Sequence, residues 1–242
     1  MSYIIVRKMI QMNKEVSIDE ISLYPKHLER PLLVLMVWTI VLFGYYSFLP
    51  RYFSGGINYS DAPFVSAGYY FLACIFTFLV FRNELKDIYE TGWFKPEYKD
   101  FAVFTALVPI IFYFILTYGS ISKLLGPSLV ELVPVQILYA LPKTIEIFFQ
   151  QILILLMVFW LFEWIHKPYL VVATFAIGFS AMHLLLRLVM DEGAAEYFTI
   201  AASFGGPLFA WLILKKKNGF FYSYLTHWSF YLATLVFVYL II

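Results

Sequence analysis

The sequence predicts an all-α, polytopic membrane protein, with about seven transmembrane helices around a polar intramembrane chamber. Hydrophobic residues make up 62% of the 242 residues and charged residues only 14%, whereas a soluble domain carries about 25% charged residues. Apolar runs of about 18 or more residues recur along the chain, and each is long enough to cross a bilayer. Runs this long and continuous are typical of helices rather than of barrel strands.

The apolar runs predict where each span lies. Residues 1–30 mix charges without a continuous apolar core, so we expect a polar or interfacial arm and no cleavable signal peptide. The spans are expected at about residues 31–49, 63–81, 101–118, 143–162, 169–189, 197–214 and 220–242. A further crossing within residues 120–142 would make eight. We treat 31–141 as the first membrane helices and 142–242 as the core of a single membrane domain.

Local residues set the expected boundaries. Pro31 suits a first helical position, and the charged residues 82–100 predict a loop. Residues 119–143 contain three prolines and predict a loop with a short or re-entrant helix. Turns are expected at 191–193 and at 218–219. Gly205 and Gly206, in the sixth span, predict a close contact between helices.

Loop charges predict the orientation. Most loop Lys and Arg residues fall on the side of the N-terminal arm, which predicts a cytoplasmic N-terminus in the cell's inner or plasma membrane. The smaller set on the other side is Arg51, Lys123, Lys143 and Arg187. A net charge of +1 indicates no nucleic-acid partner. The one cysteine, Cys74, is expected to be a small buried hydrophobe, and no zinc-type cysteine spacing occurs.

Polar groups at membrane depth mark a candidate site, because an ionisable residue there is costly and usually faces the protein interior. Three pairs at helical spacing, i and i+4, each share one face of a span. The pairs are Glu146 with Gln150, Phe179 with His183, and His227 with Tyr231. Gln151 adds a further polar group to the first of these spans.

The depths of these groups differ. Glu146 lies near the start of its span and His183 in the second half of the next, antiparallel span, so they are expected to share a depth. His227 lies about two turns, roughly 10 Å, into the last span. The three can meet only if the fourth span begins earlier, near Gln136, or if the seventh is displaced.

One carboxylate and two imidazoles permit two chemistries. Glu146 can act as a general base on a water that attacks a peptide carbonyl, with a histidine positioning the water or stabilising the oxyanion. Glu and two His can also bind zinc, but no HExxH motif occurs, and we predict no metal ion and no cofactor. Each residue taken alone also has a purely structural explanation. The helix dipole favours an acidic residue such as Glu146 near a helix start, and each histidine can form a hydrogen bond to a neighbouring helix.

Segment 142–231 resembles the CPBP family, which holds type II CAAX-processing endopeptidases and bacteriocin-immunity (Abi-like) proteins. The family pattern is EExxxR, then FxxxH, then HxxxN. Here IEIFFQ at 145–150, FSAMH at 179–183 and HWSFY at 227–231 occupy these places. The chain departs from the pattern at Ile145, Gln150 and Tyr231, where the family has Glu, Arg and Asn.

The resemblance implies a glutamic intramembrane endopeptidase. It implies that Glu146 and His183 activate water, and that His227 with Tyr231 binds the oxyanion, supported by Gln150 and Phe179. The expected partners are the lipid bilayer and a membrane-associated peptide or protein substrate, lipidated or not. Because Ile145 cannot act as a base, an inactive relative that binds a peptide or membrane-protein partner is the alternative. A small proton-coupled transporter that uses Glu146 and the histidines is the third hypothesis.

Overall fold

The computed structural model describes residues 26–48, 59, 62–90, 137–188, 192–216 and 218–241. In these ranges the regular structure is entirely helical, which confirms the all-α prediction for this part of the chain. The expected span at 101–118, most of the arm at 1–30 and the uncertain segment 119–136 lie outside the described residues.

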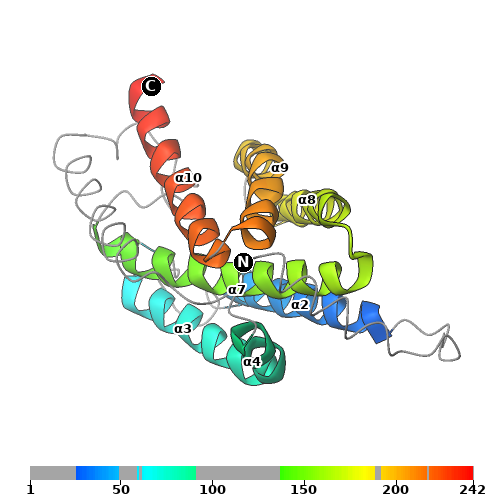
Figure 1. The fold of residues 1–242 in the computed structure, drawn as a ribbon. Coiled ribbons are helices and arrows are strands. Elements are labelled where there is room, and N and C mark those ends of the chain that lie inside the picture. Colours follow the sequence, from blue (N-terminus) through cyan, green and yellow to red (C-terminus); the bar gives the residue numbers. More distant parts are fainter. Residues whose placement is uncertain are drawn as a thin grey trace, which may run out of the picture.

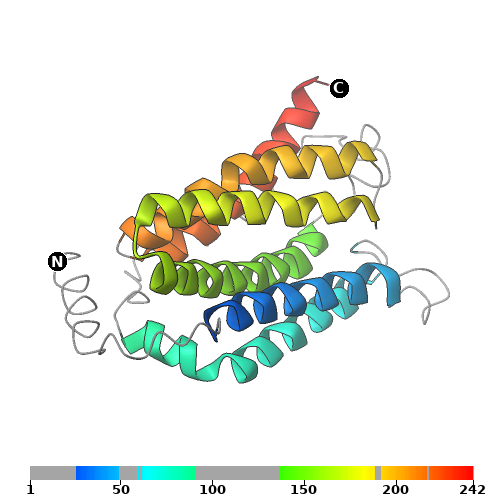
Figure 2. The ribbon, with the colours of Figure 1, turned by 90° about the vertical axis from the view of Figure 1, so that its right-hand side faces the viewer.

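Helix α7 (Ile137–Ile165) lies in the middle of the molecule. Helices α2 (Lys26–Phe43) and α3 (Pro63–Val80) pack on one side of it. Helices α8 (Pro168–Leu184), α9 (Glu192–Lys215) and α10 (Gly219–Ile241) cover the other side, as Figures 1 and 2 show. In the apolar membrane-spanning stretch of α7, 78% of the residues are buried inside the protein. In that of α8 only 17% are. A helix that is hydrophobic all round is expected in such a central position.

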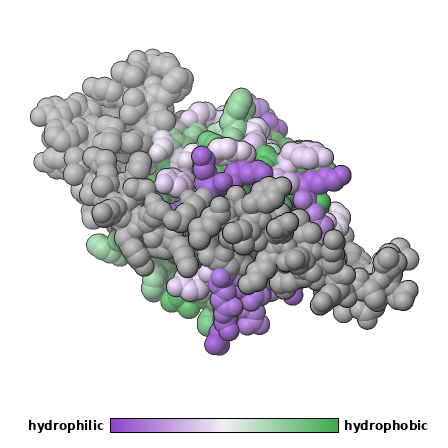
Figure 3. All heavy atoms as spheres, in the orientation of Figure 1, coloured by the Kyte–Doolittle hydropathy of each residue, from purple (hydrophilic) through white to green (hydrophobic). Residues whose placement is uncertain are grey.

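Five of the described helical segments are long and apolar enough to cross a membrane. They are Glu29–Ser47, Pro63–Val80, Ala140–Ile165, Pro168–Leu188 and Ala195–Lys215. Helix α3 shows the reason most clearly, since Phe64 and Leu79 on its outer face are 71% and 70% exposed. Figure 3 shows this apolar surface at the lower left, where α3 lies. Apolar exposure of this extent is typical of a lipid-facing surface, so the chain is an integral membrane protein.

Helix α2 begins earlier than expected and ends in a π turn, Gly44–Phe48 (η3). Pro31 is therefore inside the helix rather than at its first position; the residues before it, with Glu29 in the first turn, extend the helix into the polar arm. Near the other end of α2 the Tyr69 hydroxyl donates a hydrogen bond to the Val41 carbonyl (2.8 Å). This carbonyl lies just before the point where the α-helix changes to the π turn. A Cβ at Gly44 would overlap this hydroxyl.

Two further boundary predictions were wrong. The start of the charged segment 82–100 is a helix, α4 (Arg82–Glu90), because Ile88 gives it one fully buried apolar contact among charged residues. Helix α9 begins at Glu192, so the second and third residues of the expected turn at 191–193 are helical. The acidic side chain of Glu192 suits a first helical turn.

Two other predictions agree with the structure. Asn218 adopts a positive φ of 63° between α9 and α10, as a tight turn requires. A Cβ on Gly206 would lie 3.2 Å from the Phe179 ring and 3.3 Å from the main chain of Ala176. Glycine at this position therefore lets α8 and α9 approach closely, as expected.

Helix α7 also begins earlier than expected, at Ile137 instead of near residue 143, and Pro142 lies inside it. The proline is accommodated within the first two turns, where the helix has few main-chain bonds to lose. This early start is one of the two conditions under which Glu146, His183 and His227 were expected to approach one another.

Candidate functional site

A cavity of about 40 Å³ lies where α7 meets α2, α8 and α10. One water needs roughly 10–15 Å³ of such space, so the cavity has room for about three waters. Its lining residues are Trp38, Leu42, Tyr46, Lys143, Glu146, Gln150, Met182, His183, Leu186, Phe198 and Tyr231. Four of the six residues predicted for the site, Glu146, Gln150, His183 and Tyr231, are among them.

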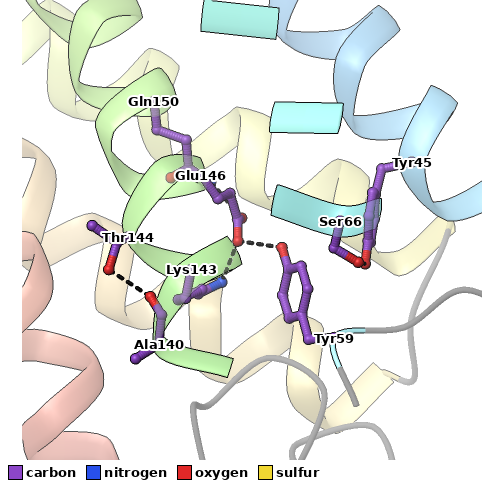
Figure 4. A network of polar contacts seen from close by, with 8 residues as sticks. All are labelled: Tyr45, Tyr59, Ser66, Ala140, Lys143, Thr144, Glu146 and Gln150. Carbon is purple, nitrogen blue, oxygen red and sulfur yellow. Dashed lines mark hydrogen bonds and ion pairs between the residues drawn. The ribbon is translucent and has the colours of Figure 1, made fainter. Parts of the chain in front are cut away.

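Glu146 is buried on α7 and accepts three hydrogen bonds. Figure 4 shows those from Lys143 and Tyr59. Lys143 Nζ donates to Oε2 over 2.8 Å, and the Tyr59 hydroxyl donates to the same oxygen. Gln150 Nε2 donates to Oε1, also over 2.8 Å. A carboxylate has about four acceptor positions, so one remains for a further donor such as a water in the cavity.

Lys143 is a site residue that sequence reasoning missed. Its side chain is 1% exposed, forms an ion pair with Glu146, and lies 4.3 Å from the Tyr231 ring centroid and 5.5 Å from that of Tyr59. Two aromatic faces thus contribute to holding the ammonium group away from lipid. Counting Lys143 as a loop charge was therefore wrong. The i, i+3 spacing from Glu146 was the available signal.

Tyr59 is the third residue that donates a hydrogen bond to the Glu146 carboxylate. It lies outside the five segments that are able to span a membrane. Burial raises the pKa of Tyr59 well above its usual range, and the neighbouring Glu146 carboxylate raises it further. The phenol therefore stays protonated and remains a donor. No motif in the sequence distinguishes Tyr59 from the other tyrosines of the chain.

His183 faces the cavity from α8 with a defined protonation pattern. Its Nδ1 lies 2.8 Å from the Phe179 carbonyl oxygen, which can only accept, so Nδ1 carries a proton. In the neutral ring Nε2 is then an acceptor. Within the described residues no hydrogen-bond partner is recorded for that nitrogen. Phe179 and Trp38 pack against the ring, with centroids 4.5 and 6.4 Å away.

His227 lies beside the cavity rather than on its lining. Its Nδ1 is 2.9 Å from Gln151 Nε2, one helical position beyond Gln150 on α7. Its ring stacks on Tyr231 (5.6 Å between centroids), which does line the cavity. Phe179 does not line the cavity either, but it contacts Phe209, whose ring centroid is 5.0 Å from that of His227. Gln151 is thus, after Lys143 and Tyr59, the third site residue that sequence reasoning did not assign.

The described residues contain no group of three or more His, Cys, Asp or Glu side chains that could hold a metal ion. Comparison with known proteins found no matching family model, no matching curated protein and no matching solved structure.

Proposed function

We propose that this protein is an intramembrane endopeptidase that hydrolyses a peptide bond near the membrane surface, with seven spans around a polar chamber. The observation that carries the proposal is the shared, water-sized cavity of Glu146, His183 and Tyr231, which come from α7, α8 and α10. A carboxylate, an imidazole with an open acceptor nitrogen and a phenol around a few waters are the groups that hydrolysis of an amide requires.

The geometry favours His183 as the proton acceptor, a role that the sequence had suggested for Glu146. Nε2 of His183 has no hydrogen bond to the part of the chain that the structure describes, whereas three donors already occupy Glu146. A water held by the remaining acceptor position of Glu146 gives its proton to His183 as its oxygen attacks the carbonyl carbon. The protonated imidazole then returns that proton to the leaving amine. Tyr231 and His227 are the proposed oxyanion donors.

The depth of these groups fits cleavage close to the membrane surface. Glu146 lies six residues into the apolar segment Ala140–Ile165, which corresponds to about 9 Å. His183 lies five residues before the end of Pro168–Leu188, or about 8 Å. Because α7 and α8 are antiparallel neighbours (Figure 2), both groups approach the same surface.

The two residues that flank Glu146 pack against different clusters. Ile145 packs against the main core, where its carbonyl lies 3.9 Å from the Cys74 thiol. Ile147 instead shares a buried cluster with Tyr231. Neither isoleucine lines the cavity, so Glu146 is the only carboxylate there among the described residues.

One observation favours a second candidate, an inactive relative that binds a peptide. Lys143 neutralises Glu146 at 2.8 Å, an arrangement that can serve structure alone. In that case the cavity would receive a peptide side chain without cleaving it.

The test is cleavage of a fluorogenic membrane-proximal peptide, prenylated or not, by the purified protein in detergent. Glu146→Gln and His183→Asn are expected to lower kcat at least ~100-fold, the usual contribution of general acid–base groups. The matched controls, Glu163→Gln and His166→Asn, change exposed residues at the far end of α7 and should retain the parent activity. His166 has a positive φ of 56°, which asparagine tolerates.

The outcomes separate the candidates. Binding of the peptide without any cleavage would overturn the protease and support the inactive relative. Equal decreases in kcat in the site variants and the control variants would also overturn the protease proposal. A chelator should leave the rate unchanged, and sensitivity to it would contradict the metal-free mechanism.

A further inference from the structure

The two adjacent glutamines of α7 serve different partners. Gln150 donates to Glu146, whereas Gln151 points to α10, where it meets Ser223 and His227. Ser223 and His227 are four residues apart and therefore lie on one face of α10. All three side chains are buried, at no more than 5% exposure. No solvent competes for these hydrogen bonds, so their direction is set by the protein.

The orientation of the Gln151 amide decides the direction of these hydrogen bonds. With its Oε1 2.7 Å from the Ser223 hydroxyl, which donates to it, the other end of the amide, Nε2, is the donor toward α10. Gln151 Nε2 faces His227 Nδ1 at 2.9 Å, so Nδ1 must accept. A neutral imidazole that accepts at Nδ1 carries its proton on Nε2.

We infer that Gln151 is a positioning residue that holds His227 in the tautomer with its proton on Nε2. This inference rests on the proposed function, because an oxyanion donor is what needs that proton. The two histidines then have opposite tautomers. His183 presents an acceptor nitrogen to the cavity, and His227 retains a donor.

The surroundings also fix the plane of the His227 ring. Its centroid is 5.0 Å from that of Phe209 and 5.6 Å from that of Tyr231, with interplanar angles of 35° and 25°. These aromatic contacts leave the in-plane nitrogens as the polar contacts of the ring. A single amide donor on Nδ1 is therefore enough to decide where the proton resides.

The test is nitrogen NMR of the full-length protein labelled with ¹⁵N-histidine. The chain has four histidines, and His227→Gln assigns the relevant pair of signals. In the unmodified protein, Nδ1 of His227 should have the ¹⁵N chemical shift of an unprotonated ring nitrogen, and Nε2 should have that of a protonated one. Gln151→Glu replaces the amide with a pure acceptor and should move the proton to Nδ1. Ser223→Ala, which frees the amide to turn, should give a mixture of both tautomers.

Thr226→Val is the control for Ser223→Ala, since it also removes a hydroxyl from α10, one that donates to the Tyr222 carbonyl within the same helix (2.7 Å), and it should leave the His227 signals as in the parent. A protonated Nδ1 in the parent would overturn the inference, as would Gln151→Glu signals identical to those of the parent. If the parent cleaves peptide, Gln151→Glu should lower kcat about 100- to 1,000-fold, the effect of losing one oxyanion donor, with little change in KM. If the parent has no hydrolytic activity, the proposed function fails, whereas the NMR signals still decide the role of Gln151.

Discussion

Replacing Lys143 with methionine should destabilise the protein far more than the loss of a surface charge. Lys143 and Glu146 form an ion pair at 2.8 Å with side chains 1% and 4% exposed. The substitution leaves the carboxylate buried without a counter-ion. Breaking a buried pair by removing one partner costs about 3–5 kcal/mol, since the remaining charge stays desolvated.

The expected shift in melting temperature follows from the size of the chain. For about 150–250 residues, 1 kcal/mol corresponds to roughly 2–4 °C, so Lys143→Met should lower Tm by roughly 6–20 °C. The double variant Lys143→Met/Glu146→Gln removes both charges. It should recover most of the lost stability, because replacing a whole buried pair is often close to neutral.

The single cysteine can be used to measure Tm by thiol labelling. Cys74 is the single cysteine and is 5% exposed on α3, with its thiol 3.9 Å from the Ile145 carbonyl of α7. A thiol-reactive fluorophore therefore labels the protein only when α3 and α7 separate. Labelling followed during heating in detergent gives Tm for each variant.

Lys86→Met is the matched control. Lys86 pairs with Glu90 at 3.7 Å, but both side chains are more than 60% exposed, and such pairs contribute about 0–1 kcal/mol. If Lys143→Met shifts Tm no more than Lys86→Met does, the buried pair is not the stabilising element inferred here. A double variant as unstable as the sum of its single changes would refute the coupling of the two charges.

Three further predictions concern packing and topology. Gly206→Leu should cost about 1–3 kcal/mol by forcing α8 and α9 apart, whereas Gly178→Leu, at an exposed position with open space, should be near neutral in the same labelling assay. Tyr69→Phe should cost about 0.5–1.5 kcal/mol by removing the hydrogen bond that its hydroxyl donates to the Val41 carbonyl of α2, and Tyr89→Phe, at an exposed position of α4, almost nothing. In a cysteine-free background, Lys167→Cys, in the exposed α7–α8 turn, should react with a membrane-impermeant thiol reagent only from the cytoplasmic side.

Helix positions could be predicted because the length of an apolar run decides whether it spans a bilayer. The expected span at 63–81 differs from α3 by one residue. Helix starts could not be predicted as well, since polar residues continue α2 and α9 beyond their apolar runs, and α7 continues through Pro142, which had predicted a boundary. Helices α2, α7 and α9 all begin before their predicted spans.

The part of the candidate site that could be predicted is the part where the depth of two side chains in the membrane is enough to bring them together. Glu146 and His183 lie on antiparallel neighbouring helices at one depth, and they share the cavity. His227 was expected about two turns into the last span, away from the other two groups, and it contacts α7 at Gln151 rather than at Glu146. The contact between Gln151 and His227 depends on the rotation of α7 and α10 about their axes, which the spacing along one sequence does not determine.

Lys143 shows why the sequence alone misassigned one element of the topology. A lysine at the polar start of an apolar run resembles a loop charge, yet three residues later an acid in the same helix neutralises it. Once Lys143 is removed from the loop charges, the side opposite the N-terminal arm retains only Arg51, Lys123 and Arg187. The charge bias therefore favours a cytoplasmic N-terminus more strongly. Under the proposed function, with seven spans and this orientation, α7 would begin on the outer side and substrates would reach the cavity from outside the cytoplasm.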